Sequence, residues 1–161
     1  MRRMLDDAFA GDMSDEDWDH ALGGWHVLVE DDDDDGRPIA HAAVVPRRLE
    51  LGAQVLHGGY VEAVGTAPDH RRRGLGRLAM VQIDTLLRRH FEVGALATGS
   101  HEFYEALGWE RWRGLTYVRH GGELRRSPEE DDAIMVLRYG VSADVDLDGP
   151  IVCDARPGDD W

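Results

Sequence analysis

Four arginines and two glycines stand close together in the stretch APDHRRRGLGRLAM, residues 67–80, of a chain whose net charge is −14. A strand-like run precedes this stretch and a helix-like run follows it. Backbone N–H groups at the start of a helix lack intrahelical partners and carry partial positive charge, so they bind anions. Gly74 and Gly76 would let an anion reach that backbone without obstruction by a Cβ atom. The stretch predicts a diphosphate site, with charge supplied to the outer oxygens by Arg71, Arg72, Arg73 and Arg77.

The stretch lacks the motifs of two common phosphate loops. It has no Gly-Lys-Ser/Thr, which excludes a Walker loop, and it does not contain the GxGxxG fingerprint of dinucleotide-binding folds. The plainer alternative is a basic helix start that neutralises an acidic surface. The order of elements around the stretch argues against that alternative, because a motif gains weight from its structural context.

Hydrophobic periodicity predicts the elements that position this loop. We expect helices at 1–11, between Ser14 and Gly23, at 74–89 and at 100–108. We expect strands at 25–30, 38–45, 47–59 with a turn at Gly52, 60–68, 91–98 and 133–140, a solvated hairpin turn at 31–36, and a loop-rich end at 148–161. Together they predict a mixed α/β architecture: an antiparallel meander, a long helix after a strand, and a parallel return.

The composition limits the function classes. At 161 residues and 42% hydrophobic content we expect one domain, residues 1–161, with no apolar run long enough to cross a bilayer. The N-terminal residues do not resemble a signal peptide, and a single cysteine excludes an internal disulfide, so we expect a cytoplasmic location. The excess of 32 acidic over 18 basic residues disfavours nucleic acid and anionic membranes and favours cationic ligands, although acidic surfaces also serve solubility alone. The eight histidines show no metal-ligand spacing and no predicted catalytic role.

The pattern Arg71-x-x-Gly74-x-Gly76 resembles the acetyl-CoA pyrophosphate loop of the GNAT (Gcn5-related) N-acetyltransferases, and the order of the elements around it is similar to theirs. The resemblance implies the GNAT acyl-CoA N-acyltransferase fold, an α/β fold with a mixed, mostly antiparallel sheet flanked by helices. It implies acetyl-CoA as the cofactor, bound by Val64, Gly65, Thr66, Arg71, Arg72, Arg73, Gly74, Leu75 and Gly76. Tyr104 matches the tyrosine near the thioester sulfur, where a phenol could protonate the leaving thiolate; on residue type alone it could instead be a core aromatic.

Longer stretches of the sequence resemble one particular group within this family. AFAGDMSDEDWDHALGGWHVLV, IAHAAVVPRRL, GYVEAV and the ending CDARPGDDW are similar to the aminoglycoside 2'-N-acetyltransferases of actinobacteria, over nearly the whole chain. The resemblance implies acetyl transfer to the 2'-amino group of an aminoglycoside, which is a polycation, by a homodimeric protein. It implies that Glu62 acts as a remote base through water. By position, the acceptor contacts are Asp12, Asp17, Glu62, Ala63, Thr98, Glu129, Glu130, Asp159 and Trp161.

Several alternatives accompany these assignments. Each carboxylate could be an ordinary surface acid, an alternative that is weakest for Glu62 because an unpaired charge inside an apolar strand is costly. Direct attack of the amine on the thioester needs no acyl-enzyme, so Cys153 is expected to be a packing residue, while a backbone N–H near Val64 would stabilise the developing oxyanion. A GNAT enzyme for another polyamine or amino sugar, and a non-catalytic binding module, are the other functions considered. The family begins with a strand before the first helix, and we expect that strand to be missing here, through a late start or a shortened sheet edge.

Overall fold

The apolar runs on either side of Gly52 form two long neighbouring strands, β2 (Arg37–Leu51) and β3 (Gln54–Thr66). The turn between them uses the left-handed backbone of Gly52, whose φ is +59°. We predicted that the run before Gly52 and the run after it would each form two separate strands, and this prediction was wrong. Pro46 does not end β2, because it lies between the last residue paired with β1, Val44, and the first residue paired with β9, Leu49, where that edge needs no N–H donor.

A computed structural model describes residues 1–31 and 36–161, so most of the expected turn at 31–36 lies outside the described residues. The described chain forms two compact units. Unit 1 comprises Met1–Val45 and Val61–Leu86, and unit 2 comprises Pro46–Tyr60 and Leu87–Trp161. Strands β2 and β3 contribute to both units, and the expectation of one domain stays a prediction. Within the two described ranges, no helix has the length and apolar character needed to span a membrane.

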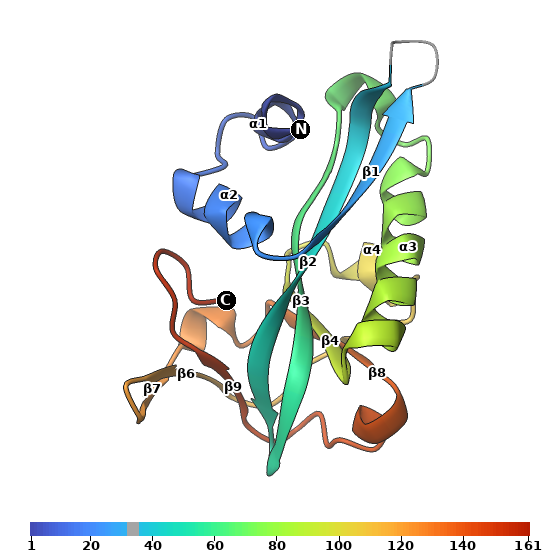
Figure 1. Cartoon of the computed structure of the whole chain (residues 1–161). Helices are drawn as coiled ribbons and strands as arrows, with labels where there is room; N and C mark the ends of the chain where they lie inside the picture. The colour runs from blue at the N-terminus through green and yellow to red at the C-terminus, as the bar shows by residue number, and fades with distance from the viewer. Residues whose placement is uncertain (32–35) are drawn as a thin grey trace. The chain divides into compact units, whose positions relative to one another are not determined.

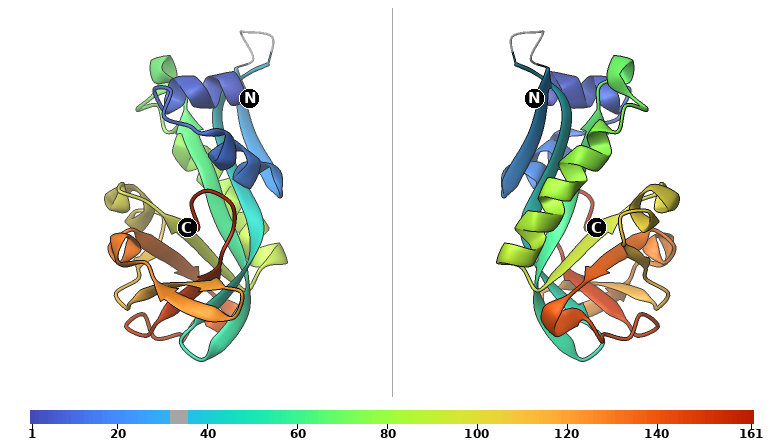
Figure 2. Two further views of the ribbon diagram at one scale, coloured as in Figure 1. Left: turned by 90° about the vertical axis from the view of Figure 1, so that its left-hand side faces the viewer. Right: turned by 90° about the vertical axis from the view of Figure 1, so that its right-hand side faces the viewer.

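Unit 1 is built on a hairpin with helices on both faces. Strand β1 (Trp25–Asp31) pairs antiparallel with β2, from Trp25 opposite Val44 to Asp31 opposite Arg37. Helices α1 (Arg2–Ala8) and α2 (Asp15–Leu22) lie on one face of these strands, and α3 (Leu75–His90) lies on the other (Figure 1, Figure 2). The predicted helix after the arginine loop is thereby confirmed.

Helix α1 packs closely on the end of β3. A Cβ atom added to Gly65 would lie 3.0 Å from Leu5 Cδ2 and 3.2 Å from Ala8 Cβ, so the side-chain face of Gly65 is filled by the helix. Leu5 itself is fully buried. Gly65 is therefore required for the close packing of α1, independently of any contact that its backbone makes.

Unit 2 contains the parallel return that the sequence predicted. Strand β3 pairs parallel with β4 (Val93–Ala97), β4 pairs antiparallel with β8 (Ile134–Arg138), and β8 pairs with β5 (Glu110–Arg111). On the other side, β2 pairs antiparallel with β9 (Ile151–Asp154), β9 pairs parallel with β6 (Thr116–His120), and β6 pairs with β7 (Glu123–Arg126). Short helical segments complete the unit: α4 (His101–Glu105), η2 (Pro128–Glu130) and η3 (Gly140–Ser142).

Several strands of unit 2 were not predicted. The end of the chain, predicted to be loop-rich, contains one of them, because Ile151–Asp154 form β9 and pair with strands on both sides. Strands β6 and β7 were not predicted at all. Their residues carry three arginines and one histidine among few apolar positions, and β7 is exposed throughout, so no alternation of burial marks it in the sequence.

Candidate functional site

The predicted phosphate loop lies in unit 1, between the turn η1 (Pro68–His70) and α3. Gly74 has a φ of +80°, and a Cβ atom there would meet nothing within 4 Å. Arg72 also has a left-handed backbone, with a φ of +61°, and the side chains of Arg72 and Arg73 are exposed. Leu75 is the first residue of α3 and Gly76 the second. An anion at this loop would meet open backbone and exposed guanidinium groups at the start of a 16-residue helix.

Arg71 differs from its neighbours because the fold itself uses its side chain. Its Nη2 donates to the carbonyl oxygen of Ala8 at 2.6 Å, at the C-terminal end of α1, and its Nε lies 3.5 Å from the carbonyl oxygen of Thr66. A cation is favourable at a helix C-terminus, where the dipole is negative. Arg71 therefore ties the loop to α1 and to β3.

The end of β3 carries a reversed backbone at Ala63, whose φ is +50°. Among the described residues, it is the only residue with a positive φ that lies inside a strand. Glu62, Ala63 and Val64 are all half-buried, so the usual alternation of burial along the strand is interrupted. A left-handed conformation costs a non-glycine residue about 1–2 kcal/mol, so the surroundings must hold it.

Two histidines hold the carbonyl group of Ala63. His41 is fully buried in β2, and its Nδ1 donates to Ala63 O at 2.7 Å. Its Nε2 lies 2.9 Å from Nδ1 of His26, in β1. Burial lowers the pKa of both imidazoles, so both rings are neutral at neutral pH. Because Nδ1 of His41 carries the hydrogen, its Nε2 accepts a hydrogen bond from His26.

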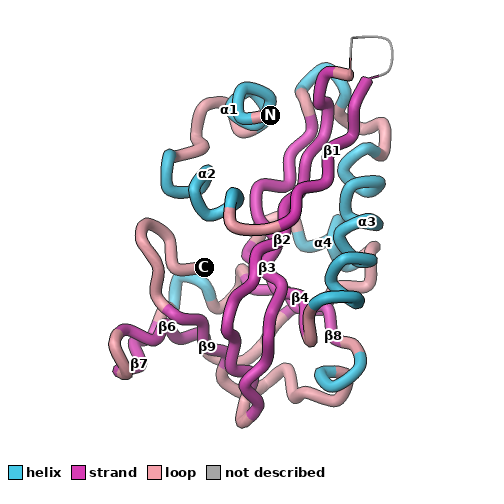
Figure 3. The backbone as a smooth tube through the Cα atoms, in the orientation of Figure 1, coloured by secondary structure: helices cyan, strands magenta, loops and turns pink. Residues whose placement is uncertain are grey.

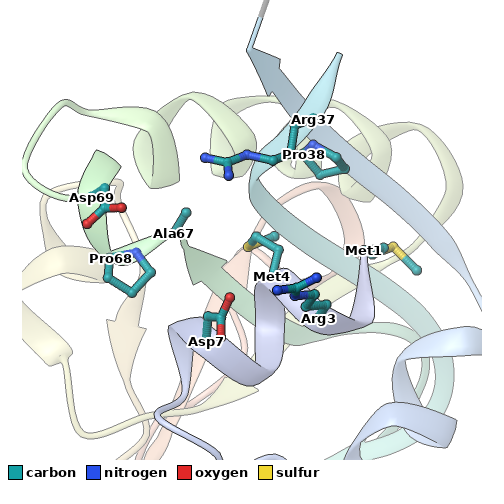
Figure 4. A pocket seen from close by; sticks show the side chains of 9 residues that line it. All are labelled: Met1, Arg3, Met4, Asp7, Arg37, Pro38, Ala67, Pro68 and Asp69. Carbon is teal, nitrogen blue, oxygen red and sulfur yellow. The ribbon is translucent and has the colours of Figure 1, made fainter. Parts of the chain in front are cut away.

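A cavity of about 410 Å³ in unit 1 is lined in part by Ala67, Pro68 and Asp69, which precede the phosphate loop in the chain (Figure 4). Its lining includes side chains of both charges, Arg3 and Asp7 from α1, Arg37 from the start of β2, and Asp69 from η1. Because the lining carries both positive and negative side chains, its charge gives no reason to assign a polycation to this cavity.

Four of the predicted acceptor residues come together in unit 2. The pKa of Glu130 is raised above its usual range, chiefly by burial and then by the negative charges of Asp159 and Glu129. Trp161 is buried, and its Nε1 donates to Ser127 Oγ at 3.0 Å, one residue before η2. The chain after β9 thus returns to the segment that carries Glu129 and Glu130 (Figure 3).

The returning tail, residues 154–161, is held by two arginines that the sequence analysis did not single out. Arg47, which is buried, donates from Nη1 to Asp160 O at 2.7 Å and from Nη2 to Asp154 O. Arg156 donates to Asp159 O at 2.7 Å and to Trp161 O at 3.0 Å. Both guanidinium groups lie over the ring of Tyr60, at 5.4 and 5.6 Å from its centroid.

Asp131 follows Glu130 directly but has a different environment. Arg126 donates to its Oδ1 and Oδ2 at 2.9 and 2.7 Å, and the backbone N–H of Thr116 donates to Oδ1 at 3.0 Å. The bidentate arginine holds the pKa of this carboxyl well below its usual range. The carboxylate of Asp131 thus has a structural role, because it joins β6 to β7. The carboxylate of Glu130 instead lies close to other negative charges.

The remaining predicted residues of unit 2 are placed as follows. Tyr104 is buried, with its ring edge-on to Phe103 at 4.9 Å and to Trp109 at 6.0 Å, and burial raises its pKa to about 12. The Thr98 hydroxyl accepts a hydrogen bond from the N–H of Ser100 at 2.9 Å, which organises the start of α4. Cys153 is fully buried, in agreement with the expected packing role.

The two predicted acceptor acids of unit 1 differ in what holds them. Asp12 is exposed, in the segment between α1 and α2. Asp17 is half-buried and caps α2: its backbone N–H donates to Ser14 Oγ at 3.0 Å, and its Oδ2 accepts from the N–H of Ser14 at 2.9 Å, a capping box that confirms the predicted helix start. In the parts of the chain that the structure describes, no three histidine, cysteine or acidic side chains gather as metal ligands would.

The histidine pair and the two tail arginines had a sequence signal that could have been used. His41 interrupts the apolar run PIAHAAVV, and Arg47 follows the same run in VVPRRLEL. A polar residue inside a strand that is buried on both faces needs a hydrogen-bond partner in the fold, so such an interruption indicates an internal bond. The sequence does not say which partner it meets.

Comparisons with known proteins agree with this architecture. Residues 1–112 match the acetyltransferase (GNAT) domain family. The chain is 42% identical to an aminoglycoside 2'-N-acetyltransferase from Mycolicibacterium fortuitum, over 99% of this chain and 83% of that protein. A GNAT family acetyltransferase from Brucella melitensis, solved with acetyl-CoA, superposes with a TM-score of 0.61 at 16% identity, over 93% of this chain and 84% of that one.

A GCN5-related N-acetyltransferase from Kribbella flavida superposes with a TM-score of 0.58 at 24% identity over 70% of this chain, which spans about 30% of that protein's length. These superpositions, together with a sheet whose described strands pair mostly antiparallel, confirm the predicted α/β fold. The matched domain and the relative from Mycolicibacterium fortuitum show the family directly: this chain belongs to the GNAT acetyltransferases.

Proposed function

We propose that this protein transfers an acetyl group from acetyl-CoA to the 2'-amino group of an aminoglycoside. The observation that carries the choice of acceptor is the group of carboxylates formed by Glu129, Glu130 and Asp159, in a chain 42% identical to an aminoglycoside 2'-N-acetyltransferase. The charges of Glu129 and Asp159 contribute to the raised pKa of Glu130, and a polycation would relieve that repulsion.

The phosphate loop fits acetyl-CoA. The backbone of Gly74 is open on its side-chain face, α3 begins directly after it, and Arg72 and Arg73 stand exposed beside it. These are the features that a diphosphate needs, since main-chain N–H groups bind its inner oxygens and guanidinium groups its outer ones. Acetyl-CoA supplies an acetyl thioester, the electrophile of the reaction.

Three residues of this chain are proposed to act on the reacting atoms. Glu62 accepts, through water, the proton of the acceptor ammonium, so that the neutral amine can attack the thioester carbon. The N–H of Val64 stabilises the negative charge that develops on the thioester oxygen. With a pKa near 12, Tyr104 is protonated at neutral pH and donates a hydrogen bond to the leaving sulfur.

The acceptor is proposed to contact Asp12, Asp17, Ala63, Thr98, Glu129, Glu130, Asp159 and Trp161. Support comes from unit 2, where Trp161 is anchored to Ser127 and its terminal carboxylate accepts a hydrogen bond from Arg156 of the same tail. We further propose that the protein is a homodimer of the cytoplasm, on the support of the family resemblance and the single cysteine. Light scattering at several concentrations and cell fractionation test these two points.

The test of the reaction is release of free CoA thiol with a panel of amines. We expect activity with tobramycin and with kanamycin B, which carry a 2'-amino group, and none with kanamycin A, which carries a hydroxyl there. Equal activity on the two kanamycins would remove the 2' assignment. Activity confined to other polyamines would assign a different acceptor, and tight acetyl-CoA binding by calorimetry without thiol release would favour a binding module.

Substitution of the proposed base tests catalysis separately from binding. We expect Glu62→Gln to lower kcat about 100-fold while the calorimetric affinity for acetyl-CoA stays close to that of the wild type, since a general base contributes to the chemical step. The dependence of kcat/KM on pH should lose its lower limb. An unchanged pH–rate profile would count against Glu62 as the base.

A further inference from the structure

We propose that His41 is a positioning residue for acetyl transfer: by binding the carbonyl of Ala63, it directs the N–H of Val64 towards the thioester oxygen. This inference rests on the proposed function, because the reaction that His41 would assist is the proposed acetyl transfer. It concerns a residue that touches no reacting atom and that acts through one peptide group of β3.

The geometry of the peptide bond connects the two groups. The carbonyl of Ala63 and the N–H of Val64 belong to the same planar, trans peptide unit, so they point in opposite directions. His41 Nδ1 lies 2.7 Å from Ala63 O. A hydrogen bond that fixes the direction of the carbonyl therefore fixes the direction of the N–H as well.

The same bond explains how Ala63 keeps its conformation. A φ of +50° is unfavourable for alanine, and within the described strands this residue alone has a positive φ. A fully buried donor on the neighbouring strand stabilises the conformer whose carbonyl points towards β2. Loss of the donor would leave the carbonyl without this partner and let residue 63 relax towards an ordinary strand conformation, which turns the N–H of Val64 away.

His26 extends the arrangement by one step. It donates to Nε2 of His41 at 2.9 Å, which fixes the tautomer that carries the hydrogen on Nδ1. Hydrogen bonds in such a chain polarise one another, so the histidine pair also makes the Val64 N–H a better donor. The pair lies entirely in unit 1, on β1 and β2, beside the strand that it controls.

Four variants test the proposal by steady-state kinetics on tobramycin. We expect His41→Leu, which keeps the volume but loses the donor, to lower kcat and kcat/KM together by about 10- to 100-fold, because the oxyanion contact exists only in the transition state. His41→Asn places an amide N–H where Nδ1 stood and should recover most of the activity. Ala63→Gly, which adopts a positive φ without strain, should raise kcat about tenfold when it is combined with His41→Leu, relative to His41→Leu alone.

Val44→Ala is the matched control for a general loss of packing. Val44 is fully buried in the same strand as His41, and its truncation lowers stability by leaving a cavity without touching Ala63 O. We expect its kcat to match the wild type at a temperature where both are folded. If Val44→Ala lost as much activity as His41→Leu, or if Ala63→Gly restored nothing, the role of His41 would be purely structural and the proposal would be overturned.

A measurement without substrate separates this inference from the proposed function. Backbone chemical shifts of residue 63 report its φ directly, and they should move from left-handed to extended values in His41→Leu and remain left-handed in His41→Asn. If the wild type acetylated no aminoglycoside, the proposed function would fail while these shifts still decided the positioning role. A left-handed residue 63 in His41→Leu would overturn the inference in either case.

Discussion

The phosphate loop, residues 71–76, and the tail, residues 154–161, are both predicted to bind a charged substrate, but the fold holds them by different means. Apart from Arg71, whose side chain binds Ala8 O, the loop depends on its backbone: Gly74 and Arg72 have positive φ angles, and the charged side chains of Arg72 and Arg73 are exposed. The tail depends on side chains, because Arg47 and Arg156 bind its carbonyl groups and Trp161 is buried.

This difference predicts opposite sensitivities to substitution. Changes of backbone preference should disturb the loop more than changes of its exposed side chains. In the tail, loss of one buried side chain should release several carbonyl groups at once. The four predictions below test this contrast, from the largest expected effect to the smallest.

Arg47→Met should have the largest effect. It keeps the length of the side chain but leaves Asp154 O and Asp160 O without their donor, which costs about 3 kcal/mol of unfolding free energy. We expect the KM for the aminoglycoside to rise about tenfold or more, since an ordered tail is needed to orient its contacts, with the KM for acetyl-CoA unchanged. The control is Arg48→Met, which breaks partly exposed ion pairs with Glu50 and with the side chain of Asp154 but touches no tail carbonyl, and it should cost about 0.5 kcal/mol. Equal effects of the two variants would contradict the contrast.

Asp131→Asn and Glu130→Gln should shift stability in opposite directions. The depressed pKa of Asp131 means that its carboxylate stabilises the fold above the usual aspartate range, and we expect Asp131→Asn to lose about 2 kcal/mol at pH 7, less as the pH falls towards 3. The raised pKa of Glu130 means that its charge destabilises the fold, so Glu130→Gln should raise the Tm at pH 7, and the gain should vanish in acid as the wild-type carboxyl is protonated. Thermal melts from pH 3 to 8 measure both, and shifts of the same sign would refute the assignment.

Gly74→Ala should weaken acetyl-CoA binding by about 1 kcal/mol, or about fivefold in KM, because alanine disfavours the φ of +80° that the loop uses. The control is Gly52→Ala. It has a φ of +59° and equally open surroundings, so it should lose similar stability with no change in the KM for acetyl-CoA. A KM that Gly74→Ala leaves unaltered would show that the loop does not depend on its backbone.

Arg73→Gln should have the smallest effect, about a two- to threefold rise in the KM for acetyl-CoA, because an exposed charge is screened by solvent and salt. The rise should shrink as ionic strength increases from 0.05 to about 0.5 M. Arg125→Gln, an exposed arginine of β7, serves as the control and should leave that KM unchanged at every salt concentration. A loss for Arg73→Gln larger than that for Gly74→Ala would reverse the contrast.

Local patterns predicted much of this molecule. The Ser14–Asp17 capping box, the helix after Gly74 and the parallel return into β4 follow from caps, glycines and periodicity, which are properties of a few adjacent residues. Strands β6 and β7 could not be predicted in this way. Their stability depends on Asp131, which binds Arg126 and Thr116 after the chain has folded.

The candidate site shows the same limit. The run SPEEDD predicts several acids near the acceptor, but composition cannot separate Glu130, which remains crowded by negative charge, from Asp131, which is paired with an arginine. Likewise, the arginine loop identifies Arg71 as one cation among four, although its side chain binds the carbonyl oxygen of Ala8, 63 positions away in sequence. Such partners are set by tertiary contacts, which a single sequence does not record.

The burial of Cys153 has a practical consequence for the study of this protein. Its thiol donates to Asp160 O at 3.3 Å, and burial raises its pKa to about 12, so almost no thiolate forms at neutral pH. A colorimetric thiol reagent will therefore detect CoA released in turnover with no background from the native enzyme. The same reagent will label Cys153 only when residues 154–161 detach. The rate of labelling therefore measures how often the C-terminal segment opens.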